Sequence, residues 1–433
     1  MLTDRYELTM ASAALADGTA DRACVFEVFT RRLPPGRRFG VVAGTARVVD
    51  AVLDARFTGA DLDWLRSVGL DDEALLEFLA SWRFTGSIDG YREGELYFPG
   101  SPVLTVTGPF AEAVLLETFV LSALNHDSAV AAAAARMVLA AGGRPLVEMG
   151  SRRSHERAAV DAARAAWLAG FAATSNLAAG EKYGIPTVGT TAHAFTLLHD
   201  DERAAFDAQV AAAGPGTTLL VDTYDIRAGI GNAVAAAGPG LGMIRIDSGD
   251  LPVLAHQARE QLDALGATGT KILLSGDLDE YSLAGLGAAP VDTFGVGTSV
   301  VTGSGAPTAG FVYKLVEVEG RPVAKRSEGK NTTGGRKWAH RRHRETGTAE
   351  EEVVGMGPEP APDAGTTALQ VRFVTHGARA VQFSPDGARA GQPVALTDSR
   401  EYLRAALVTL PWDGVKLSAG DPAIPTTAPG GTR

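Results

Sequence analysis

The sequence predicts an α/β fold, in which a seven-stranded α/β barrel lies beside a mixed α/β domain built mainly from the N-terminal residues. From about residue 145 to residue 300, short apolar runs rich in β-formers recur roughly every 17 to 31 residues, with helix-like stretches between them. Residues 1 to 140 lack this repeat. The chain of 433 residues is 45% hydrophobic and 21% charged, which suits two or three globular domains and excludes a wholly disordered chain.

These patterns divide the chain into four segments. A mixed α/β domain is expected over residues 1–140, completed by strands from residues 311–412, and the catalytic barrel is expected over residues 141–310. Residues 311–412 are expected to contribute a hairpin, a basic loop and a C-terminal α/β segment. Residues 413–433 are rich in proline, glycine and alanine, and we expect them to form a disordered tail.

The first segment contains three clear local patterns. Residues 3–15 are predicted to form a helix with Thr3 as its N-cap, and residues 24–33 alternate as a strand does. Residues 109–142 are predicted to form one long helix.

Further strands are expected near the C-terminus. Residues 311–327 are predicted to form a hairpin that turns at Glu319 and Gly320. Residues 346–367 are acidic and rich in proline and glycine, so they are predicted to form a surface loop.

The barrel prediction depends on seven strand-like runs and on the residues at the end of each run. The runs are PLVEMG (145–150), GFAATS (170–175), TVGTTAH (187–193), TTLLVDT (217–223), MIRIDSGD (243–250), KILLSGD (271–277) and DTFGVGT (292–298). Polar residues end these runs, and in a barrel the carboxyl ends of the strands converge on the face that carries the chemistry. A single acid there could equally cap the next helix, but a convergent set favours a site.

Composition excludes several classes of protein. The net charge of −11 opposes general nucleic-acid binding, because an acidic protein repels a phosphate backbone. The one cysteine, Cys24, cannot form an intrachain disulfide, which indicates a reducing compartment. The N-terminal residues lack a signal-peptide pattern and no long apolar run occurs, so we expect a soluble, cytoplasmic protein without a membrane span.

Two features suggest that the chain binds phosphate without a nucleotide-binding motif. Neither a P-loop nor a dinucleotide-binding glycine turn is present, but FGVGTSVVT places Gly297 and Thr298 at a strand end, where backbone N–H groups and a hydroxyl can hold an anion. A flexible loop is the alternative. Arg152 and Arg153 come after another strand and offer planar donor pairs for a carboxylate or a phosphate.

A basic segment stands out in this acidic chain. Residues 321–344 hold nine Lys and Arg residues against one acid. Such a cluster favours a polyanion, with a solvated hairpin or a nucleic-acid site as alternatives. Small phosphorylated substrates fit the overall charge better.

Among the eight histidines, His193 has the most informative position. It ends the run VGTTAH, where an imidazole can act as a base or a nucleophile near neutral pH. A lone histidine is more often structural, and no His or Cys spacing predicts a zinc site. Asp222, Asp225, Asp247 and Asp250 could hold hydroxyl groups or, through water, magnesium.

Taken together, TDRYELTM, EMGSRR, GFAATSN, GTTAH, LLVDTYD, IRIDSGDL, FGVGTSVVT and KNTTGGRK resemble the nicotinate phosphoribosyltransferase family in sequence and in order. The resemblance covers roughly residues 1–345, with weaker matching to about residue 412. It implies an irregular seven-stranded α/β barrel with an N-terminal mixed α/β domain, and a homodimer with shared active sites. It also implies synthesis of nicotinate mononucleotide and diphosphate from nicotinate and 5-phosphoribosyl 1-diphosphate, coupled to ATP hydrolysis with Mg²⁺, as the entry to NAD salvage.

The resemblance also implies residue roles. His193 corresponds to a histidine that ATP phosphorylates, and Thr190 to a residue that lines the nicotinate site. Phe171 is expected to stack on the pyridine ring, with Tyr6 supplied by the other subunit. Arg245 is expected to face the base.

The remaining roles concern the sugar and its phosphate. Asp247 corresponds to the ribose ligand, and Gly276, Gly297 and Thr298 to the cradle of the 5-phosphate. The magnesium ligands are not assigned individually. The segment after GSRR departs from the glycine-containing version of the family.

Two other functions compete with this one. A quinolinate-using barrel phosphoribosyltransferase would need no nucleophilic histidine, so ATP dependence separates the two. A non-catalytic protein that binds polyanions through residues 321–344 would show salt-sensitive RNA binding and would not consume nicotinate.

Overall fold

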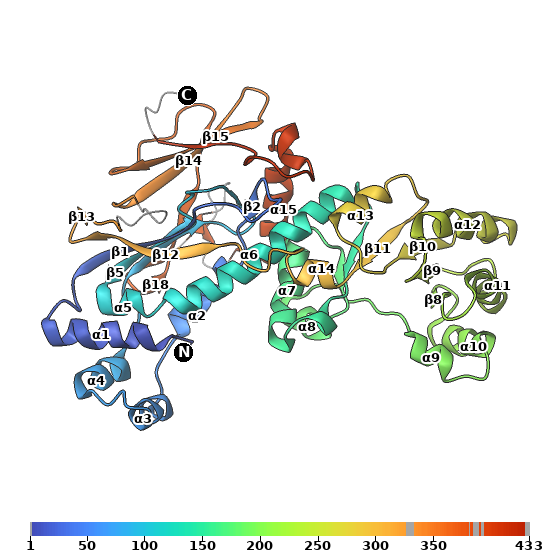
Figure 1. Cartoon of the computed structure of the whole chain (residues 1–433), viewed down its shortest axis with the longest axis horizontal. Helices are drawn as coiled ribbons and strands as arrows, with labels where there is room; N and C mark the ends of the chain where they lie inside the picture. The colour runs from blue at the N-terminus through green and yellow to red at the C-terminus, as the bar shows by residue number, and fades with distance from the viewer. Residues whose placement is uncertain (1, 326–332, 381, 384–388, 391–393, 429–433) are drawn as a thin grey trace. The chain divides into compact units, whose positions relative to one another are not determined.

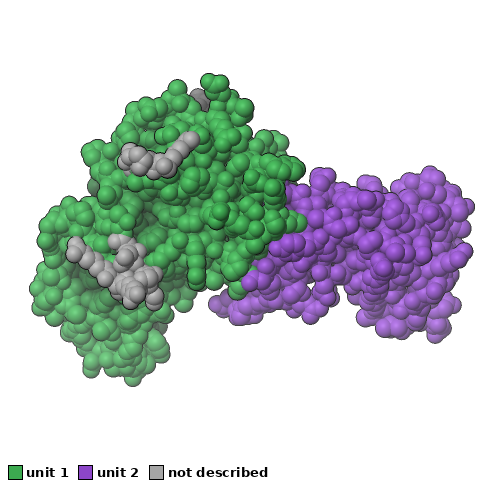
Figure 2. Space-filling model, turned by 45° about the horizontal axis from the view of Figure 1, so that its top comes forward, with its two compact units in different colours: residues 1–132, 306–433 green, residues 133–305 purple. Residues whose placement is uncertain are grey.

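The computed structural model describes residues 2–325, 333–380, 382–383, 389–390 and 394–428, and it divides the chain into two compact units (Figure 2). The first unit is made from two separate stretches, residues 1–132 and 306–433, and the second unit is residues 133–305. The second unit overlaps the predicted barrel segment. The N-terminal and C-terminal stretches share one unit.

An antiparallel seven-stranded sheet organises the first unit. Its strands have the order β13-β12-β1-β5-β3-β17-β18. The bounds are β1 (Ala23–Thr30), β3 (Ser87–Tyr91), β5 (Leu104–Pro109), β12 (Phe311–Val318), β13 (Arg321–Pro322), β17 (Gln370–Thr375) and β18 (Ala378–Arg379). The predicted hairpin is confirmed, because β12 pairs with β13 and both Glu319 (φ 51°) and Gly320 (φ 71°) adopt the left-handed conformation that such a tight turn needs.

Helices of the N-terminal stretch of the first unit contribute residues to one core with the sheet, and Figure 1 shows where the helices lie. The bounds are α1 (Arg5–Asp17), α2 (Thr45–Asp54), α3 (Gly59–Ser67), α4 (Glu73–Ser81), α5 (Phe110–Val114) and α15 (Leu396–Val408), while α6 (Glu117–Ala140) runs from the first unit into the second. Leu8 of α1, Val48 of α2 and Leu75 of α4 are buried with Phe26 of β1. The ring of Phe26 stacks on the ring of Tyr313, with centroids 4.8 Å apart, and this contact joins the neighbouring strands β1 and β12.

Two local predictions for this unit were wrong. The N-cap of α1 is Asp4, not Thr3, and the hydroxyl of Thr3 instead donates to the carboxylate of Glu7. The predicted helix over 109–142 is two helices, since α5 ends at Val114 and α6 begins at Glu117.

A second sheet in the first unit corrects two more predictions. Its order is β16 (Thr366–Ala368), β14 (Lys337–His343), β15 (Ala349–Met356) and β21 (Thr426–Thr427). The predicted surface loop 346–367 therefore contains a strand. The expected disordered tail is wrong for residues 413–428, because a 3₁₀ helix spans Trp412–Val415 and β21 pairs with β15; residues 429–433 lie outside the described residues.

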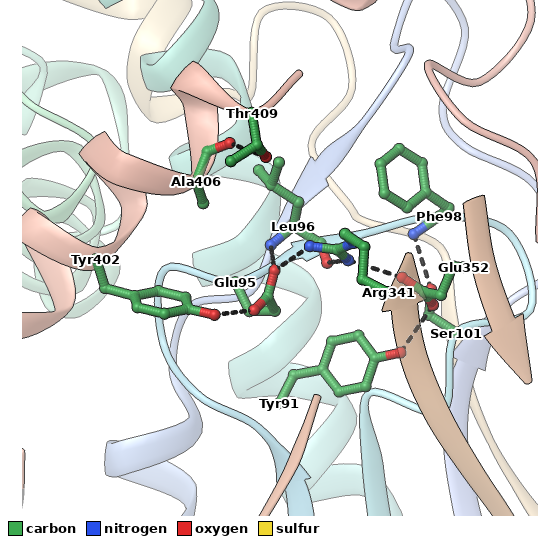
Figure 3. Close-up of polar contacts among 10 residues, drawn as sticks. All are labelled: Tyr91, Glu95, Leu96, Phe98, Ser101, Arg341, Glu352, Tyr402, Ala406 and Thr409. Atoms are coloured by element: carbon green, nitrogen blue, oxygen red, sulfur yellow. Dashed lines mark hydrogen bonds and ion pairs between the residues drawn. The ribbon is translucent and has the colours of Figure 1, made fainter. Parts of the chain in front are cut away.

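Charge pairing explains why an acidic stretch forms a strand. The side chain of Arg341, on β14, is 3% exposed and bonds to Glu352 of β15 and to Glu95, which precedes β4 (Figure 3). Tyr91 donates to Glu352 at 2.7 Å, and Tyr402 donates to Glu95. Burial opposes the charge of Arg341, but the two carboxylates outweigh it and raise its pKa.

The described part of the basic segment is largely neutralised by internal acids. Lys337 bonds to Glu27 at 2.6 Å, Arg336 to Asp89 at 2.8 Å, and Arg342 pairs with Glu351. Residues 326–332, including part of KNTTGGRK, lie outside the described residues. These pairs remove much of the positive patch that a polyanion-binding protein would need.

Two short ladders complete the strand inventory of the described residues. One joins β2 (Gly40–Val41) to β4 (Leu96–Tyr97), and the other joins β19 (Gln382–Phe383) to β20 (Arg389–Ala390).

A curled, parallel six-stranded sheet forms the centre of the second unit (Figure 1). Its order is β7-β6-β11-β10-β9-β8. The bounds are β6 (Leu146–Glu148), β7 (Ala173–Thr174), β8 (Thr218–Leu220), β9 (Met243–Ile246), β10 (Lys271–Leu274) and β11 (Thr293–Val296). Six of the seven predicted runs are therefore strands of one parallel sheet, as the βα repeat indicated.

The seventh run, 187–193, is not a strand of the sheet. Thr187 forms an isolated parallel bridge with Thr174 of β7, at one edge of the sheet. At the other end of the run, the ring of His193 lies 3.1 Å from the hydroxyl of Thr223, just after β8 at the opposite edge. We call residues 187–193 the crossing segment, because it connects the two edges of the sheet.

Helices come after most strands of the second unit. The bounds are α7 (Glu156–Leu168), α8 (Leu177–Tyr183), α9 (His193–Leu197), α10 (Glu202–Ala213), α11 (Ile226–Ala237), α12 (Leu251–Ala264), α13 (Glu280–Gly285) and α14 (Thr298–Val301), with a 3₁₀ turn at Ser151–Arg153. Across the described ranges, no helix combines the length and hydrophobicity that a membrane crossing requires.

Candidate active site

A pocket in the second unit lies at the carboxyl ends of the parallel strands. It is lined by Met149, Arg152, Arg153, Arg245, Asp247, Ser275, Gly276, Asp277, Gly295, Gly297 and Thr298. The segments after β6, β9, β10 and β11 each contribute to the lining. Seven of the residues singled out from the sequence are therefore brought together, as expected for side chains at the ends of neighbouring parallel strands.

An arginine network forms the floor of this pocket. Arg245 donates to Asp247 at 2.8 Å and to the hydroxyl of Ser275 at 2.8 Å, and it reaches the hydroxyl of Thr190 at 3.4 Å. Ser275 also donates to Asp247. Burial alone would raise the pKa of Asp247, but the bonds from Ser275 and Arg245 and the charge of Arg245 lower it, so this carboxylate is ionised at neutral pH.

The network brings Thr190 of the crossing segment into the site. Oδ1 of Asp247 accepts the hydrogen bonds from both Arg245 and Ser275, and the side chain of Asp247 is 34% exposed. The aspartate is thus fixed in orientation and still accessible to a ligand.

His193 stands beside a buried carboxylate. Its Nε2 lies 3.9 Å from Oδ1 of Asp222, and its Nδ1 lies 3.1 Å from the hydroxyl of Thr223. Asp222 Oδ2 accepts from the backbone N–H of Asp247 at 2.9 Å and from Ser248 at 2.7 Å. Oδ1 is buried and has no hydrogen-bond partner among the described residues, so its charge is directed at the imidazole.

Glycines bring the backbone close to the pocket. Gly276 adopts φ 119°, and a Cβ there would lie 2.5 Å from the carbonyl oxygen of Asp247. A Cβ on Gly295 would lie 2.8 Å from Sδ of Met149. At Gly276 the positive φ and the nearby backbone oxygen both require glycine, whereas at Gly295 the nearest atom belongs to the flexible end of Met149. Neither residue has a side chain to cover the backbone N–H groups near the pocket.

Unlike Arg245, the two arginines of the 3₁₀ turn are not held by other side chains among the described residues. Arg152 and Arg153 are exposed, and among the described residues neither guanidinium has a hydrogen-bond or ion-pair partner. They are cations available for an anionic ligand.

Four predicted residues are not among those that line the pocket: Thr190 and His193, which are described above, and Phe171 and Tyr6. Phe171 is fully buried and precedes β7, at the amino end of that strand, and its expected stacking on the pyridine ring stays a prediction. Tyr6 lies on α1 of the first unit and is 46% exposed. Partial burial, with the nearby Glu117 and Glu7, raises the pKa of Tyr6 to about 12, so the phenol stays protonated.

The sequence patterns did not single out two residues that line the pocket. Met149 is the one large apolar side chain among the lining residues, and it comes directly after the last residue of β6. Ser275 comes directly after β10. Both positions, immediately after a strand, were readable from the pattern of runs, but neither side chain is typical of catalysis.

The described residues contain no group of three or more His, Cys, Asp or Glu side chains placed to hold a metal ion by themselves. A cation in this pocket would therefore need a ligand's oxygens or water to complete its coordination.

Comparison with known protein families gives a consistent result. Residues 1–125 match the nicotinate phosphoribosyltransferase N-terminal domain, and residues 145–351 match the nicotinate phosphoribosyltransferase family. The chain is 61% identical to nicotinate phosphoribosyltransferase PncB1 of Mycobacterium tuberculosis, over 98% of this chain and 94% of that protein. It is 34% identical to the human nicotinate phosphoribosyltransferase, over 84% of this chain and 81% of that protein.

Two solved structures have a fold similar to that of this chain. The crystal structure of human nicotinic acid phosphoribosyltransferase matches 99% of this chain and 98% of that chain, with a TM-score of 0.84 and 28% sequence identity. A nicotinate-nucleotide pyrophosphorylase from Pyrococcus furiosus matches 94% of this chain and 95% of that chain, with a TM-score of 0.76 and 26% identity.

Proposed function

Because the chain belongs to the nicotinate phosphoribosyltransferase family, we propose that its pocket transfers the phosphoribosyl group of 5-phosphoribosyl 1-diphosphate to nicotinate, coupled to hydrolysis of ATP. The observation that carries this proposal is the convergence of Arg152, Arg153, Arg245 and Asp247 with the backbone glycines on one pocket. The product, nicotinate mononucleotide, enters NAD biosynthesis by salvage.

The transfer step forms one bond and breaks another. The pyridine nitrogen of nicotinate attacks C1 of the ribose, and the bond from C1 to the diphosphate oxygen breaks, so the diphosphate leaves with the electron pair. Positive charge builds on the ribose while negative charge builds on the leaving group. Asp247 is ionised and can hold the ribose hydroxyls, and the two free arginines can hold the diphosphate.

The 5-phosphate of the ribose needs a separate anion site. We assign it to the backbone of Gly276 and Gly297 and to the hydroxyl of Thr298, which lie on one side of the same pocket.

His193 is proposed to accept the γ-phosphoryl group of ATP, releasing ADP, and later to lose it to water as phosphate. Asp222 favours the imidazole tautomer that carries its proton on Nε2, the nitrogen that faces the carboxylate. Nδ1 then keeps its lone pair and is the nucleophile, once the hydroxyl of Thr223 turns aside. Asp222 would also stabilise the positive charge that the ring gains on phosphorylation.

Magnesium fits this pocket as a partner of the substrate phosphates. Asp247 and Asp277 supply the one or two carboxylates that Mg²⁺ uses beside phosphate oxygens and water. When bound, the ion would neutralise charge on the diphosphate as it leaves.

The nicotinate ring is proposed to lie between the arginine network and Met149. Arg245 and Thr190 can meet the carboxylate of the base, and Met149 offers the apolar surface that a pyridine ring prefers. The resemblance implies that Phe171 stacks on the ring, and Met149 is proposed as a further ring contact.

We also propose that the crossing segment acts as the seventh strand of the barrel. It starts at one edge of the sheet and ends at the other, and it carries both Thr190 and His193. Cys24 is buried and not in a disulfide, which fits a reducing, cytoplasmic setting.

The histidine is tested by incubating the protein with γ-labelled ATP. The wild type is expected to acquire an acid-labile label, and His193→Ala is expected to lose both the label and nicotinate-stimulated ATP hydrolysis. His256→Ala, on the exposed face of α12, is the matched control and should keep both. Full labelling of the His193→Ala variant would show that another residue accepts the phosphoryl group.

The proposed homodimer has a separate test. If Tyr6 completes the site of the other subunit, Tyr6→Ala and His193→Ala are each inactive, but their mixed dimer holds one intact site. With equal mixing and free exchange, activity should return towards roughly a quarter of the wild-type value, from the random pairing of subunits. No recovery, after exchange has been confirmed by a tag on one variant, would mean that each chain builds its own site.

A further inference from the structure

The two free arginines of the pocket are placed by the backbone of a short turn, because no described residue holds their side chains. The turn begins at Gly150 and continues through the 3₁₀ residues Ser151–Arg153. We call residues 150–153 the arginine turn. The contacts that fix the backbone of this turn therefore determine where the guanidinium groups of Arg152 and Arg153 can lie.

A buried acid lies directly beneath the arginine turn. Glu148, the last residue of β6, is 1% exposed. One carboxylate oxygen accepts from the backbone N–H of Gly150, and the other accepts from the hydroxyl of Thr174 at 2.5 Å. The side chain thus ties the first residue of the turn to the neighbouring strand β7.

A second contact holds the turn from the same neighbour. The amide nitrogen of Asn176 donates to the hydroxyl of Ser151 at 2.9 Å. The backbone N–H of Asn176 donates to Thr174 at 3.0 Å, so the two contacts form one connected network. Asn176 also caps α8 by accepting from Ala179, which keeps its side chain in place.

The other side of the turn is closely packed. A Cβ on Gly150 would lie 2.3 Å from Val301 of α14 and 2.8 Å from the carbonyl oxygen of Gly297. The turn therefore fits between α14 and Glu148, and movement of its backbone is resisted on both sides.

We propose that Glu148, with the Asn176–Ser151 contact, is a positioning residue for phosphoribosyl diphosphate: it fixes the arginine turn so that Arg152 and Arg153 meet the diphosphate. The proposal rests on the proposed function of this pocket. An acid without a direct ionic partner is costly to bury, and burial raises the pKa of Glu148. The hydrogen bonds that Glu148 accepts from Gly150 and Thr174 give a reason for an acid at this buried position.

The proposal predicts a specific pattern of binding constants. Glu148→Ala removes the acceptor for Gly150 and is expected to raise the Kd for phosphoribosyl diphosphate with Mg²⁺ about 10- to 100-fold. Glu148→Gln should recover most of the loss, because its amide oxygen can accept from Gly150 while its amide N–H donates to Thr174. Ser151→Ala removes only the second contact and is expected to raise the Kd about 2- to 10-fold.

A double-mutant cycle distinguishes positioning from general damage. In a background with Arg152→Ala and Arg153→Ala, Glu148→Ala and Ser151→Ala should change the Kd no further, because the side chains that the turn places are gone. Calorimetric titration with phosphoribosyl diphosphate supplies the Kd, and steady-state assays should show a higher KM for that substrate with kcat and the KM for nicotinate nearly constant.

Three outcomes would overturn the inference. They are an unchanged Kd in Ser151→Ala and in Glu148→Ala, additive effects in the arginine-free background, or a Glu148→Gln variant no better than Glu148→Ala. If Glu148→Ala fails to fold, Ser151→Ala and Glu148→Gln carry the test. Wild-type protein that neither binds phosphoribosyl diphosphate nor consumes nicotinate would instead refute the proposed function.

Discussion

Arg341 and Arg245 each lie at the centre of a cluster of polar side chains, and the two clusters differ in their exposure to solvent and in how many charged partners the arginine has. Arg341 lies in the first unit with a side chain 3% exposed, and it is held between two carboxylates that are 2% and 0% exposed (Figure 3). Arg245 lies in the second unit, is 15% exposed, and has one carboxylate partner, Asp247, that is 34% exposed. Arg245 also donates to the hydroxyl groups of Ser275 and Thr190.

The difference separates a structural cluster from a binding one. Around Arg341 the carboxylates receive further bonds from tyrosine and serine hydroxyls, and Nε of Arg341, which has no hydrogen-bond partner among the described residues, is buried, so a ligand has little access. Around Arg245 the hydroxyls and an accessible carboxylate can exchange partners when a ligand arrives. A closed cluster should therefore govern stability, and an open one should govern affinity and specificity.

The largest expected effect is on the closed cluster. Arg341→Met leaves Glu95 and Glu352 buried without their cation, and we expect a loss of about 3–5 kcal/mol in the free energy of unfolding, measured by urea denaturation. Arg404→Met removes an exposed ion pair and should change stability by less than about 1 kcal/mol. Adding Glu95→Gln and Glu352→Gln to Arg341→Met should recover much of the loss, and equal effects of Arg341→Met and Arg404→Met would contradict the comparison.

A smaller effect is expected on specificity in the open cluster. Nicotinate should be preferred over nicotinamide, because a charge-assisted hydrogen bond worth about 1.5–3 kcal/mol gives roughly 10- to 150-fold discrimination in kcat/KM. Arg245→Met should reduce this ratio while leaving the urea midpoint close to that of the wild type. Arg203→Met, on the surface of α10, is the control. Similar kcat/KM values for both bases in the wild type would refute the role of a carboxylate-binding arginine.

The smallest effect is a difference in the pH dependence of stability. Burial outweighs the nearby Lys337 and raises the pKa of Glu27 above 4.5, so its contribution to stability is present at low pH and is lost as pH rises through the raised value. The pKa of Asp247 is lowered below 3.8, so its contribution is present above that pH and is lost as pH falls through the lowered value.

Urea midpoints measured from about pH 2 to pH 8 should show both trends, because the change at Asp247 lies below its ordinary pKa of 3.8. Glu27→Gln should gain stability relative to the wild type as pH rises, and Asp247→Asn should lose it as pH rises. Parallel pH curves for the two variants would show that burial and pairing do not set these two pKa values as described.

The sequence predicted the parallel sheet and most of the pocket because both depend on local patterns. A short apolar run with a polar end identifies a strand and its carboxyl terminus. In a parallel sheet these carboxyl ends lie along one edge, whatever path the chain takes between the strands. His193, Asp247 and Thr298 were all found in this way. The crossing segment has the same pattern as the strands, and only its missing partners distinguish it.

The failures concern pairings between distant parts of the chain. The acids of 346–367 looked solvated because their partners, Arg341 and Arg342 on β14 and Tyr91 on β3, are not visible in a local window. Arg341 looked like part of a polyanion site for the same reason. The ring-stacking role that the resemblance implies for Phe171 stays a prediction; this residue precedes its strand, whereas Met149 comes directly after one.

The division of the first unit into two stretches also imposes an order on synthesis. β1 is complete early, yet its partner β12 begins at Phe311, after the whole second unit has been made. At about 5–20 residues per second, a ribosome needs roughly 15–60 seconds to cover that interval. During this time one edge of β1 has no strand beside it, whereas the second unit, whose strands are continuous in sequence, can already fold. The second unit can therefore fold before β12 covers the open edge of β1, and until then that edge is available for pairing with other chains.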